Sequence, residues 1–324
     1  MQSADIDIAT WQQHRWLNRI QSATLLVLMG GFLALLGWLL IGLPGVLMLV
    51  SVGVTGILLN PLTSPRWVMR LYGARRLDRG QAPGLWQALS VLAQRAGLRS
   101  VPSLYYVPSR ILNAFAVGAP HQSVIALTDG LIRQLNDREL LGVLAHEISH
   151  IFNNDLWVMG LADVFSRATS LLSLLGQFLL LLNLPLVLTG AAAINWWAIL
   201  LLIFAPNLSA LAQLALSRAR EYDADLNAVR LTGDPQGLAS ALAKIEQLQG
   251  GWMERILLPG RGVPEPSLLR THPRTRDRIN RLAALEPEPP AVPTTEHSLE
   301  DLPVDFRNRP ITRSPRWHVT GLWH

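Results

Sequence analysis

Residues 146–150 read His-Glu-Ile-Ser-His, and no other stretch of the 324-residue chain says more about its fold and chemistry. If these residues are helical, His146 and His150 lie one turn apart on the same face of the helix. Two imidazoles at that spacing can bind one zinc ion, with Glu147 placed to accept a proton from the attacking water molecule. The stretch therefore predicts a zinc site, and the chemistry it predicts is the hydrolysis of a peptide bond.

The sequence around this motif has the periodicity of an α-helix. Apolar residues recur at helical spacing from Leu140 to Ile151, and Asp137 is a candidate for the residue that caps the N-terminus of the helix. The alternative interpretation is a chance match, in which a helix happens to expose two histidines. The flanking apolar face favours the metal site, because the chemistry requires both histidines to lie inside a helix.

The composition indicates an integral membrane protein. Half of the residues are apolar and 16% are charged, whereas about 25% of residues are charged in an average soluble protein. Residues 20–65 and 168–217 contain no Asp, Glu, Lys or Arg. Each tract is long enough for two membrane-spanning helices of about 20 residues. The alternative is two pairs of buried helices in the core of a soluble protein.

Turn residues divide each apolar tract. The first tract is interrupted at Gly42-Leu43-Pro44-Gly45, and the second near Asn183-Leu184-Pro185 and again at Thr189-Gly190. We therefore expect two transmembrane helical hairpins, whose spans are residues 21–42, 46–62, 168–188 and 192–213. The segment before the first span is polar and is followed by no cleavage site, so we expect a retained signal anchor.

The basic residues gather beside the expected spans. The net charge is +5, and all of the basic residues except Lys244 are arginines. Arginines precede the first span and follow the second and fourth, whereas the connections at 42–45 and 183–190 carry none. By the positive-inside rule, both termini and residues 66–167 lie in the cytoplasm. The arginine-rich composition favours a bacterial inner membrane, and nucleic-acid binding is disfavoured because no binding motif accompanies the arginines.

Outside the spans, the sequence predicts a cytoplasmic domain in two parts. The expected segments are an N-terminal segment at 1–20, the hairpins at 21–62 and 168–213, the two parts of the domain at 63–167 and 214–285, and a proline-rich tail at 286–324. The tail lacks periodicity, and we expect it to be largely disordered. The fold class is therefore a mainly α-helical membrane protein with an α+β metallopeptidase domain.

Several secondary structure elements can be placed within this domain. An amphipathic pattern predicts a helix at 84–97, and three short runs predict strands at 103–107, 113–117 and 123–127. We expect the strands to form a small antiparallel sheet beside the helix that carries the two histidines. Further helices are expected at 213–231, 235–249 and 275–285. An edge strand of such a sheet can pair with an extended peptide substrate.

A catalytic zinc site needs a third protein ligand. The chain has no cysteine, so this ligand must be a histidine or a carboxylate. Asp155 is the local candidate, but helical continuation would turn it away from the zinc. Glu221 is the stronger candidate, because Asp225 follows four residues later on the same helix face and can hold the free ring nitrogen of a histidine ligand. His272 is a candidate donor to the oxyanion that forms during hydrolysis.

Four motifs occur in the same order as in a known family. They are Asn113-Ala-Phe-Ala-Val-Gly118, His146-Glu-Ile-Ser-His150, Glu221-Tyr-Asp-Ala-Asp225, and Thr271-His-Pro273 through Arg278-Ile279. With the two flanking hairpins, they resemble the HtpX-like membrane zinc metallopeptidases, which are related to the CAAX prenyl proteases. The resemblance covers roughly residues 20–285.

The resemblance implies a gluzincin-type domain and assigns roles to several residues. Glu221 would be the third zinc ligand, and His272 would lie near the active site. The strand that contains Asn113, Ala114 and Phe115 would contact the substrate backbone. The implied activity is that of a stress-linked zinc metalloendopeptidase that cleaves misfolded or damaged membrane proteins at the cytoplasmic face of the membrane.

Two other function classes, a scaffold and a transporter, fit the sequence less well. A non-catalytic scaffold or holdase could use the same fold to bind unfolded polypeptides, but such a protein has no need of a general base such as Glu147. A transporter built on the hairpins would be expected to carry ionisable residues within its spans. The two apolar tracts contain none.

Overall fold

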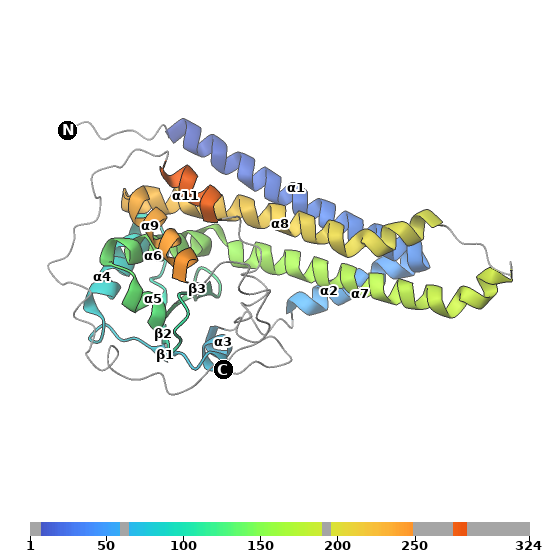
Figure 1. Cartoon of the computed structure of the whole chain (residues 1–324), viewed down its shortest axis with the longest axis horizontal. Helices are drawn as coiled ribbons and strands as arrows, with labels where there is room; N and C mark the ends of the chain where they lie inside the picture. Colours follow the sequence, from blue (N-terminus) through green and yellow to red (C-terminus); the bar gives the residue numbers. More distant parts are fainter. Residues whose placement is uncertain (1–7, 59–64, 190–195, 249–274, 284–324) are drawn as a thin grey trace. The chain divides into compact units, whose positions relative to one another are not determined.

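The computed structural model of the protein describes residues 8–58, 65–189, 196–248 and 275–283. These residues form two units (Figure 1). We call them the sheet unit, which holds the described residues of 65–157 and 220–283, and the helical unit, which holds 8–58 and the described residues of 158–219. The tail at 286–324, for which disorder is predicted, lies outside the described residues.

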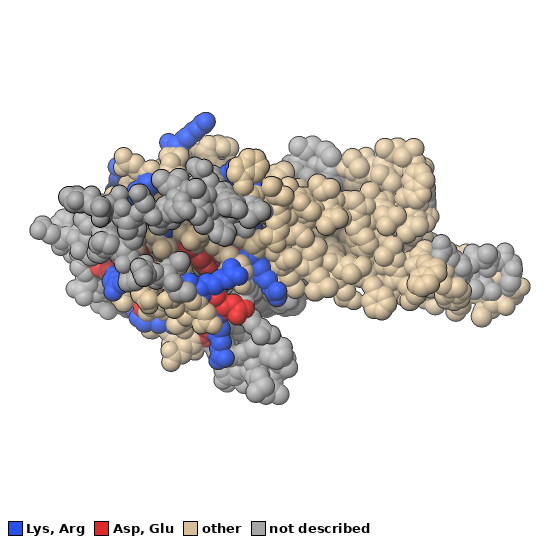
Figure 2. Space-filling view, turned by 90° about the horizontal axis from the view of Figure 1, so that it is seen from above, with Lys and Arg blue, Asp and Glu red and all other residues tan. Residues whose placement is uncertain are grey.

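The helical unit is built from long apolar helices. It contains α1 (Ile8–Ile41), α2 (Leu43–Leu58), most of α7 (Asp155–Leu188) and the first part of α8 (Trp196–Thr232). Leu36, Leu49 and Leu202 are among its buried side chains. Its surface exposes many large apolar side chains, and in Figure 2 the long helices are almost wholly uncharged. A soluble protein rarely exposes so large an apolar surface, whereas a helix in contact with lipid requires one.

Three of the described helices are long and apolar enough to cross a membrane. The qualifying segments are Arg19–Leu40 in α1, Asp155–Leu186 in α7 and Trp196–Thr232 in α8. The turn expected in the first apolar tract is present, because α1 ends at Ile41 and Gly42 has a φ of 68°. The 16-residue α2 that follows is about 24 Å long, less than the hydrocarbon core of about 30 Å.

The break predicted near Asn183-Leu184-Pro185 is wrong. Helix α7 continues through Pro185 and ends at Leu188, next to the second expected break at Thr189-Gly190 and at the end of the span expected at 168–188. A proline removes one backbone donor and its ring crowds the carbonyl four residues earlier, but a long apolar helix can tolerate it where other groups satisfy the freed backbone. Polar side chains supply further hydrogen bonds here, since Asn183 Nδ2 donates to Leu179 O at 2.8 Å and Thr189 Oγ1 donates to Pro185 O at 3.0 Å.

The sheet unit contains one four-stranded sheet. Its strands are β1 (Arg75–Arg76), β2 (Ser103–Val107), β3 (Ala114–Val117) and β4 (Val124–Thr128), in the order β1-β2-β4-β3. Strands β3 and β4 are antiparallel, but β2 and β4 are parallel. The expectation of an antiparallel sheet is therefore wrong. Residues 108–113 connect β2 to β3. These two strands are not neighbours in the sheet, because β4 lies between them, one strand spacing of about 5 Å from each.

The helices of this unit enclose its core. They are α3 (Pro65–Leu71), α4 (Pro83–Arg95), α5 (Asp129–Gln134), α6 (Asp137–Asn153), α9 (Pro235–Leu248) and α11 (Thr275–Ala283), together with the end of α8. Helix α4 matches the helix predicted at 84–97, and α9 matches the helix predicted at 235–249. Helix α6 packs against α4, α9 and β3.

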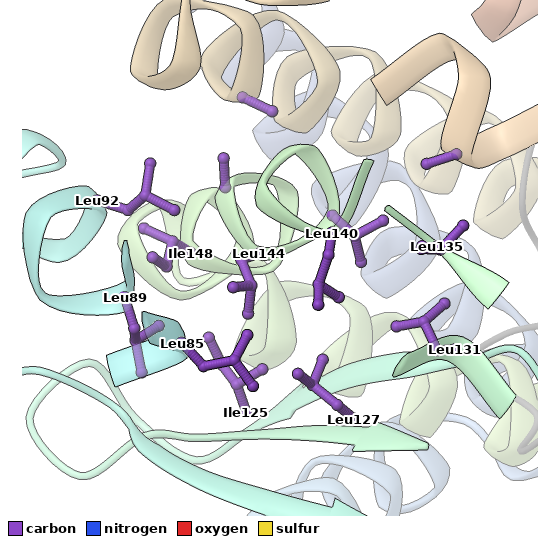
Figure 3. Close-up of a cluster of buried hydrophobic side chains, with 14 of the residues drawn as sticks. Leu85, Leu89, Leu92, Ile125, Leu127, Leu131, Leu135, Leu140, Leu144 and Ile148 are labelled. Atoms are coloured by element: carbon purple, nitrogen blue, oxygen red, sulfur yellow. The ribbon is translucent and has the colours of Figure 1, made fainter. Parts of the chain in front are cut away.

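The orientation of α6 is set by its apolar face. Leu140, Leu144 and Ile148 follow one another at intervals of four residues, and each is at most 1% exposed. Figure 3 shows them directed toward leucines of α4 and toward β4. Burying one such side chain stabilises the fold by about 1.5–3 kcal/mol. Since His146 follows Leu144 by two residues, this packing places it on the opposite side of the helix.

A capping box begins α6. Asn136 Oδ1 accepts from the backbone N–H of Glu139 at 3.0 Å, and Glu139 Oε2 accepts from the backbone N–H of Asn136 at 2.8 Å. The capping residue is thus Asn136, and the expectation of Asp137 is wrong by one position. Glu139 also accepts from Ser240 Oγ at 2.6 Å and from Lys244 Nζ at 2.7 Å. This one buried carboxylate therefore both caps α6 and ties it to α9.

Replacing Glu139 with alanine should destabilise the sheet unit. The change removes half of the capping box and the partners of Ser240 and Lys244, so we expect a loss of about 1–3 kcal/mol in the free energy of unfolding. Thermal unfolding of the detergent-purified protein, followed by circular dichroism, measures the effect. Glu246→Ala is the control, because Glu246 is an exposed glutamate on α9, the helix that Glu139 contacts. Equal melting temperatures for both variants would contradict the role of Glu139.

The contribution of Glu139 should also depend on pH. Burial alone would raise the pKa of Glu139, but hydrogen bonds from Lys244 and Ser240 lower it below the ordinary value of 4.5. A lowered pKa stabilises the folded state above the pKa of the unfolded chain, and this stabilisation is lost as the pH falls through the folded-state pKa. The difference in melting temperature between wild type and Glu139→Ala should therefore shrink below about pH 4.

Candidate metal centre

Three ligand atoms from two helices converge in the sheet unit. His146 and His150 come from α6 and Glu221 comes from α8, and their ligand atoms all lie within 4.8 Å of one another. The Nε2 atoms of the two histidines are 3.0 Å apart, and their rings are nearly perpendicular at 89°. Glu221 Oε2 lies 3.4 Å from His146 Nε2, and Oε1 lies 3.6 Å from His150 Nε2.

This donor set fits a zinc ion. Zinc in proteins takes nitrogen ligands at about 2.0–2.1 Å in tetrahedral geometry, which separates two such nitrogens by about 3.3 Å. The 3.0 Å between the histidine Nε2 atoms is close to that value. Two neutral imidazoles also cannot direct their Nε2 lone pairs at each other without a cation or a proton between them. The chemistry of the donors and their spacing therefore both suit a metal ion.

The outer ring nitrogen of His146 contacts Asp225. Asp225 Oδ1 lies 3.0 Å from His146 Nδ1, as the four-residue spacing from Glu221 predicts. Arg278 of α11 binds the same carboxylate, with Nε 2.7 Å from Asp225 Oδ2 and Nη2 2.5 Å from Oδ1. The Nη1 atom of Arg278 lies 2.9 Å from Glu221 Oε2. A single buried guanidinium therefore contacts two carboxylates of the centre and offsets part of their charge.

The outer ring nitrogen of His150 contacts Asp155. Helix α6 ends at Asn153, and the next residue, Asn154, has a left-handed φ of 58° before α7 begins at Asp155. The chain therefore turns instead of continuing as a helix, and Asp155 Oδ2 comes to lie 2.9 Å from His150 Nδ1. Arg220, the neighbour of Glu221 in sequence, lies with Nη1 3.1 Å from Asp155 Oδ1.

The centre has a strongly negative local potential. Burial alone would lower the pKa of His146, but hydrogen bonds to Asp225 and Glu221 raise it to about 10. The pKa of His150 is also raised, because the hydrogen bond to Asp155 and the charge of Glu221 outweigh burial. The pocket thus favours positive charge on its histidines. The same carboxylates would favour a divalent cation in place of those protons.

Glu147 and the substrate-contacting residues implied by the resemblance lie in the same unit. Glu147 is 8% exposed, and its carboxylate acts electrostatically on Arg278. Asn113 directly precedes β3, and Ala114 and Phe115 are its first two residues. Strand β3 is the last strand in the sheet order and packs against α6. The structure therefore brings the edge strand to the helix that carries the histidines.

Two residues of the fourth motif, His272 and Arg278, remain to be placed. His272 lies outside the described residues, so its position relative to the histidines stays a prediction. Arg278 was part of the motif that carries the resemblance, but no role was predicted for it. A signal for its burial is present in the sequence, because Arg278 precedes the apolar Leu282 by four residues and so shares its helix face.

Comparison with known proteins agrees with the site. Residues 81–286 match the model of peptidase family M48. A protein described as a protease HtpX homolog from Desulfatibacillum aliphaticivorans is 31% identical over 315 residues, covering 89% of this chain and 98% of that protein. HtpX homologs from Thermococcus sibiricus and Pyrococcus furiosus are each 35% identical, covering 81% and 83% of this chain and 94% and 96% of those proteins.

A solved structure, that of Ste24p from S. mikatae, is 20% identical with a TM-score of 0.47 and covers 83% of this chain and 66% of that one. The family match covers more than half of the chain, and the homolog from Desulfatibacillum aliphaticivorans matches over nearly its whole length. The family is one of metallopeptidases, in agreement with the His–His–Glu group of the sheet unit. The chain belongs to peptidase family M48.

Proposed function

We propose that the protein is a membrane-bound zinc endopeptidase that cleaves misfolded or damaged membrane proteins at the cytoplasmic face of a bacterial inner membrane. The observation that carries the proposal is the convergence of His146, His150 and Glu221, with Glu147 one residue from His146 on the same helix. This arrangement supplies three ligands and a carboxylate beside them, as zinc-assisted hydrolysis of a peptide bond requires.

In this proposal each residue of the centre has a separate task. His146, His150 and Glu221 would hold the zinc ion, which when bound supplies a Lewis acid that polarises the substrate carbonyl and lowers the pKa of a water molecule. Glu147 would accept the proton of the attacking water and pass it to the leaving amine. Asp225 would hold the Nδ1 atom of His146, and His272 would donate to the oxyanion.

The proposed substrate is an extended polypeptide that pairs with β3. The N–H of Thr128 in β4 donates to Asn113 O at 3.0 Å, so Asn113 faces β4 with its backbone. Backbone groups alternate between the two sides of an antiparallel strand. Ala114 and Ala116 therefore turn their N–H and C=O groups away from β4, where a substrate strand could bind them.

The membrane topology is part of the proposal. We infer two hairpins that place the sheet unit and both termini in the cytoplasm. The long apolar helices and their exposed apolar side chains support membrane insertion. Arginines at the ends of the expected spans support the orientation.

The Glu147→Gln variant tests the mechanism. Glutamine keeps the shape of the side chain but cannot accept the proton, so we expect zinc binding to be retained and casein cleavage to fall by at least about 100-fold. Zinc content and cleavage are measured on detergent-purified protein, with a chelator-treated wild type as the second control. Cleavage at the wild-type rate would contradict the role of Glu147. Zinc binding without cleavage in the wild type would favour the scaffold alternative.

Glu221→Ala tests the assignment of the third ligand. Loss of one of three protein ligands should lower the zinc content of the purified protein well below one ion per chain. The measurement is elemental analysis after dialysis against a weak chelator, with Glu246→Ala as the control on an exposed glutamate. Full zinc occupancy in Glu221→Ala would assign the third ligand to another residue.

A further inference from the structure

Each histidine of the metal centre contacts a carboxylate through its Nδ1 atom, and each of these carboxylates also contacts an arginine. For one histidine the pair is Asp225 and Arg278. For His150 it is Asp155 and Arg220. The sequence pattern points to Asp225, but the roles of both arginines and of Asp155 become visible only in the structure.

We propose that Asp155, held in place by Arg220, is a positioning residue that fixes the tautomer and the orientation of His150 for metal binding. This inference rests on the proposed function to the extent that the His–His–Glu group is a metal centre. It does not require that the protein cleave peptide bonds.

The chemistry of the imidazole explains why the contact matters. A neutral histidine carries one ring proton, and it can bind a metal through Nε2 only if that proton is on Nδ1. Asp155 Oδ2 lies 2.9 Å from His150 Nδ1, where a carboxylate oxygen can accept from Nδ1–H and so favours the tautomer with the proton on that nitrogen. His150 Nε2 then presents its lone pair toward Glu221 and the other histidine. The ring arrives in the orientation that binding needs, so no rotamer has to be selected when the metal binds.

Arg220 makes the arrangement rigid. Its side chain is 9% exposed and that of Asp155 is 3% exposed, so the ion pair between them is shielded from water. The guanidinium of Arg220 lies 3.1 Å from Asp155 Oδ1, so one carboxylate oxygen is engaged by the arginine while Oδ2 is directed at His150 Nδ1. Because Arg220 directly precedes Glu221, helix α8 supplies both a metal ligand and the support for a ligand on another helix.

A purely structural role for Asp155 is the competing explanation. Asp155 is the first residue of α7, where a carboxylate stabilises a helix through the helix dipole. That role would affect stability and would leave metal affinity and ligand geometry unchanged. Metal affinity therefore separates the two explanations.

The experiment compares the metal affinity of Asp155→Ala and Asp155→Asn with that of the wild type, all as full-length protein in detergent. Zinc affinity is measured by competition with a chromogenic chelator, and the absorption spectrum of the Co²⁺-substituted protein reports on ligand geometry. Asp163→Asn is the matched control, because Asp163 also forms an ion pair on α7, with its Oδ2 2.7 Å from Arg167 Nε, and follows Asp155 by eight residues. Circular dichroism confirms that each variant is folded.

We expect Asp155→Ala to bind zinc about 10–100-fold more weakly and to show an altered Co²⁺ spectrum. Asp155→Asn should lose less affinity, because the amide oxygen can still accept from Nδ1, and Asp163→Asn should match the wild type. If Asp155→Asn and Asp155→Ala are both folded and both bind zinc as the wild type does, the proposal is overturned. A wild type that binds zinc in this way but does not cleave casein would overturn the proposed peptidase function and leave this inference intact.

A double-mutant cycle tests the part played by Arg220. Arg220→Met alone should weaken zinc binding, because Asp155 loses its partner. In the Asp155→Ala background the same change should have little further effect, since Arg220 acts through Asp155. Two losses of affinity that simply add would contradict this dependence.

Discussion

The convergence of two imidazole nitrogens and a carboxylate on one point is the constraint on which the rest of the sheet unit depends. The Nε2 atoms of His146 and His150 are 3.0 Å apart, and Glu221 faces both. Such a group is unfavourable unless positive charge lies within it. The surrounding ion pairs supply part of this positive charge. Arg278 contacts Asp225 and Glu221, and Arg220 contacts Asp155.

The apolar core and the metal centre lie against opposite faces of α6. The leucines of α6 pack into the core, and the capping box fixes the point at which the helix begins. These two constraints set the rotation and the register of α6, and so aim the histidines at α8. A polar site of this kind needs rigid support, since a displacement of about 1 Å at a catalytic group can cost about 100-fold in rate.

The sequence predicts the elements of the fold better than the way they are arranged. Helical periodicity identifies α4, α6 and α9, because each buries one apolar stripe. The mixed sheet escapes prediction, since periodicity in β2 and β4 carries no information on strand direction. Pro185 is misleading because a proline weakens a long apolar helix without ending it. In the site, spacing points to Glu221 and Asp225. The contact of Asp155 depends on the left-handed backbone of Asn154, which interrupts the helical continuation expected for this segment.

The most direct test of the central claim is zinc X-ray absorption spectroscopy on the full-length protein as purified. If His146, His150 and Glu221 hold the ion, the spectrum should show four or five nitrogen and oxygen neighbours at about 2.0–2.1 Å, with the multiple-scattering pattern of two imidazoles. A spectrum without imidazole scattering, or protein that takes up no zinc, would contradict the account.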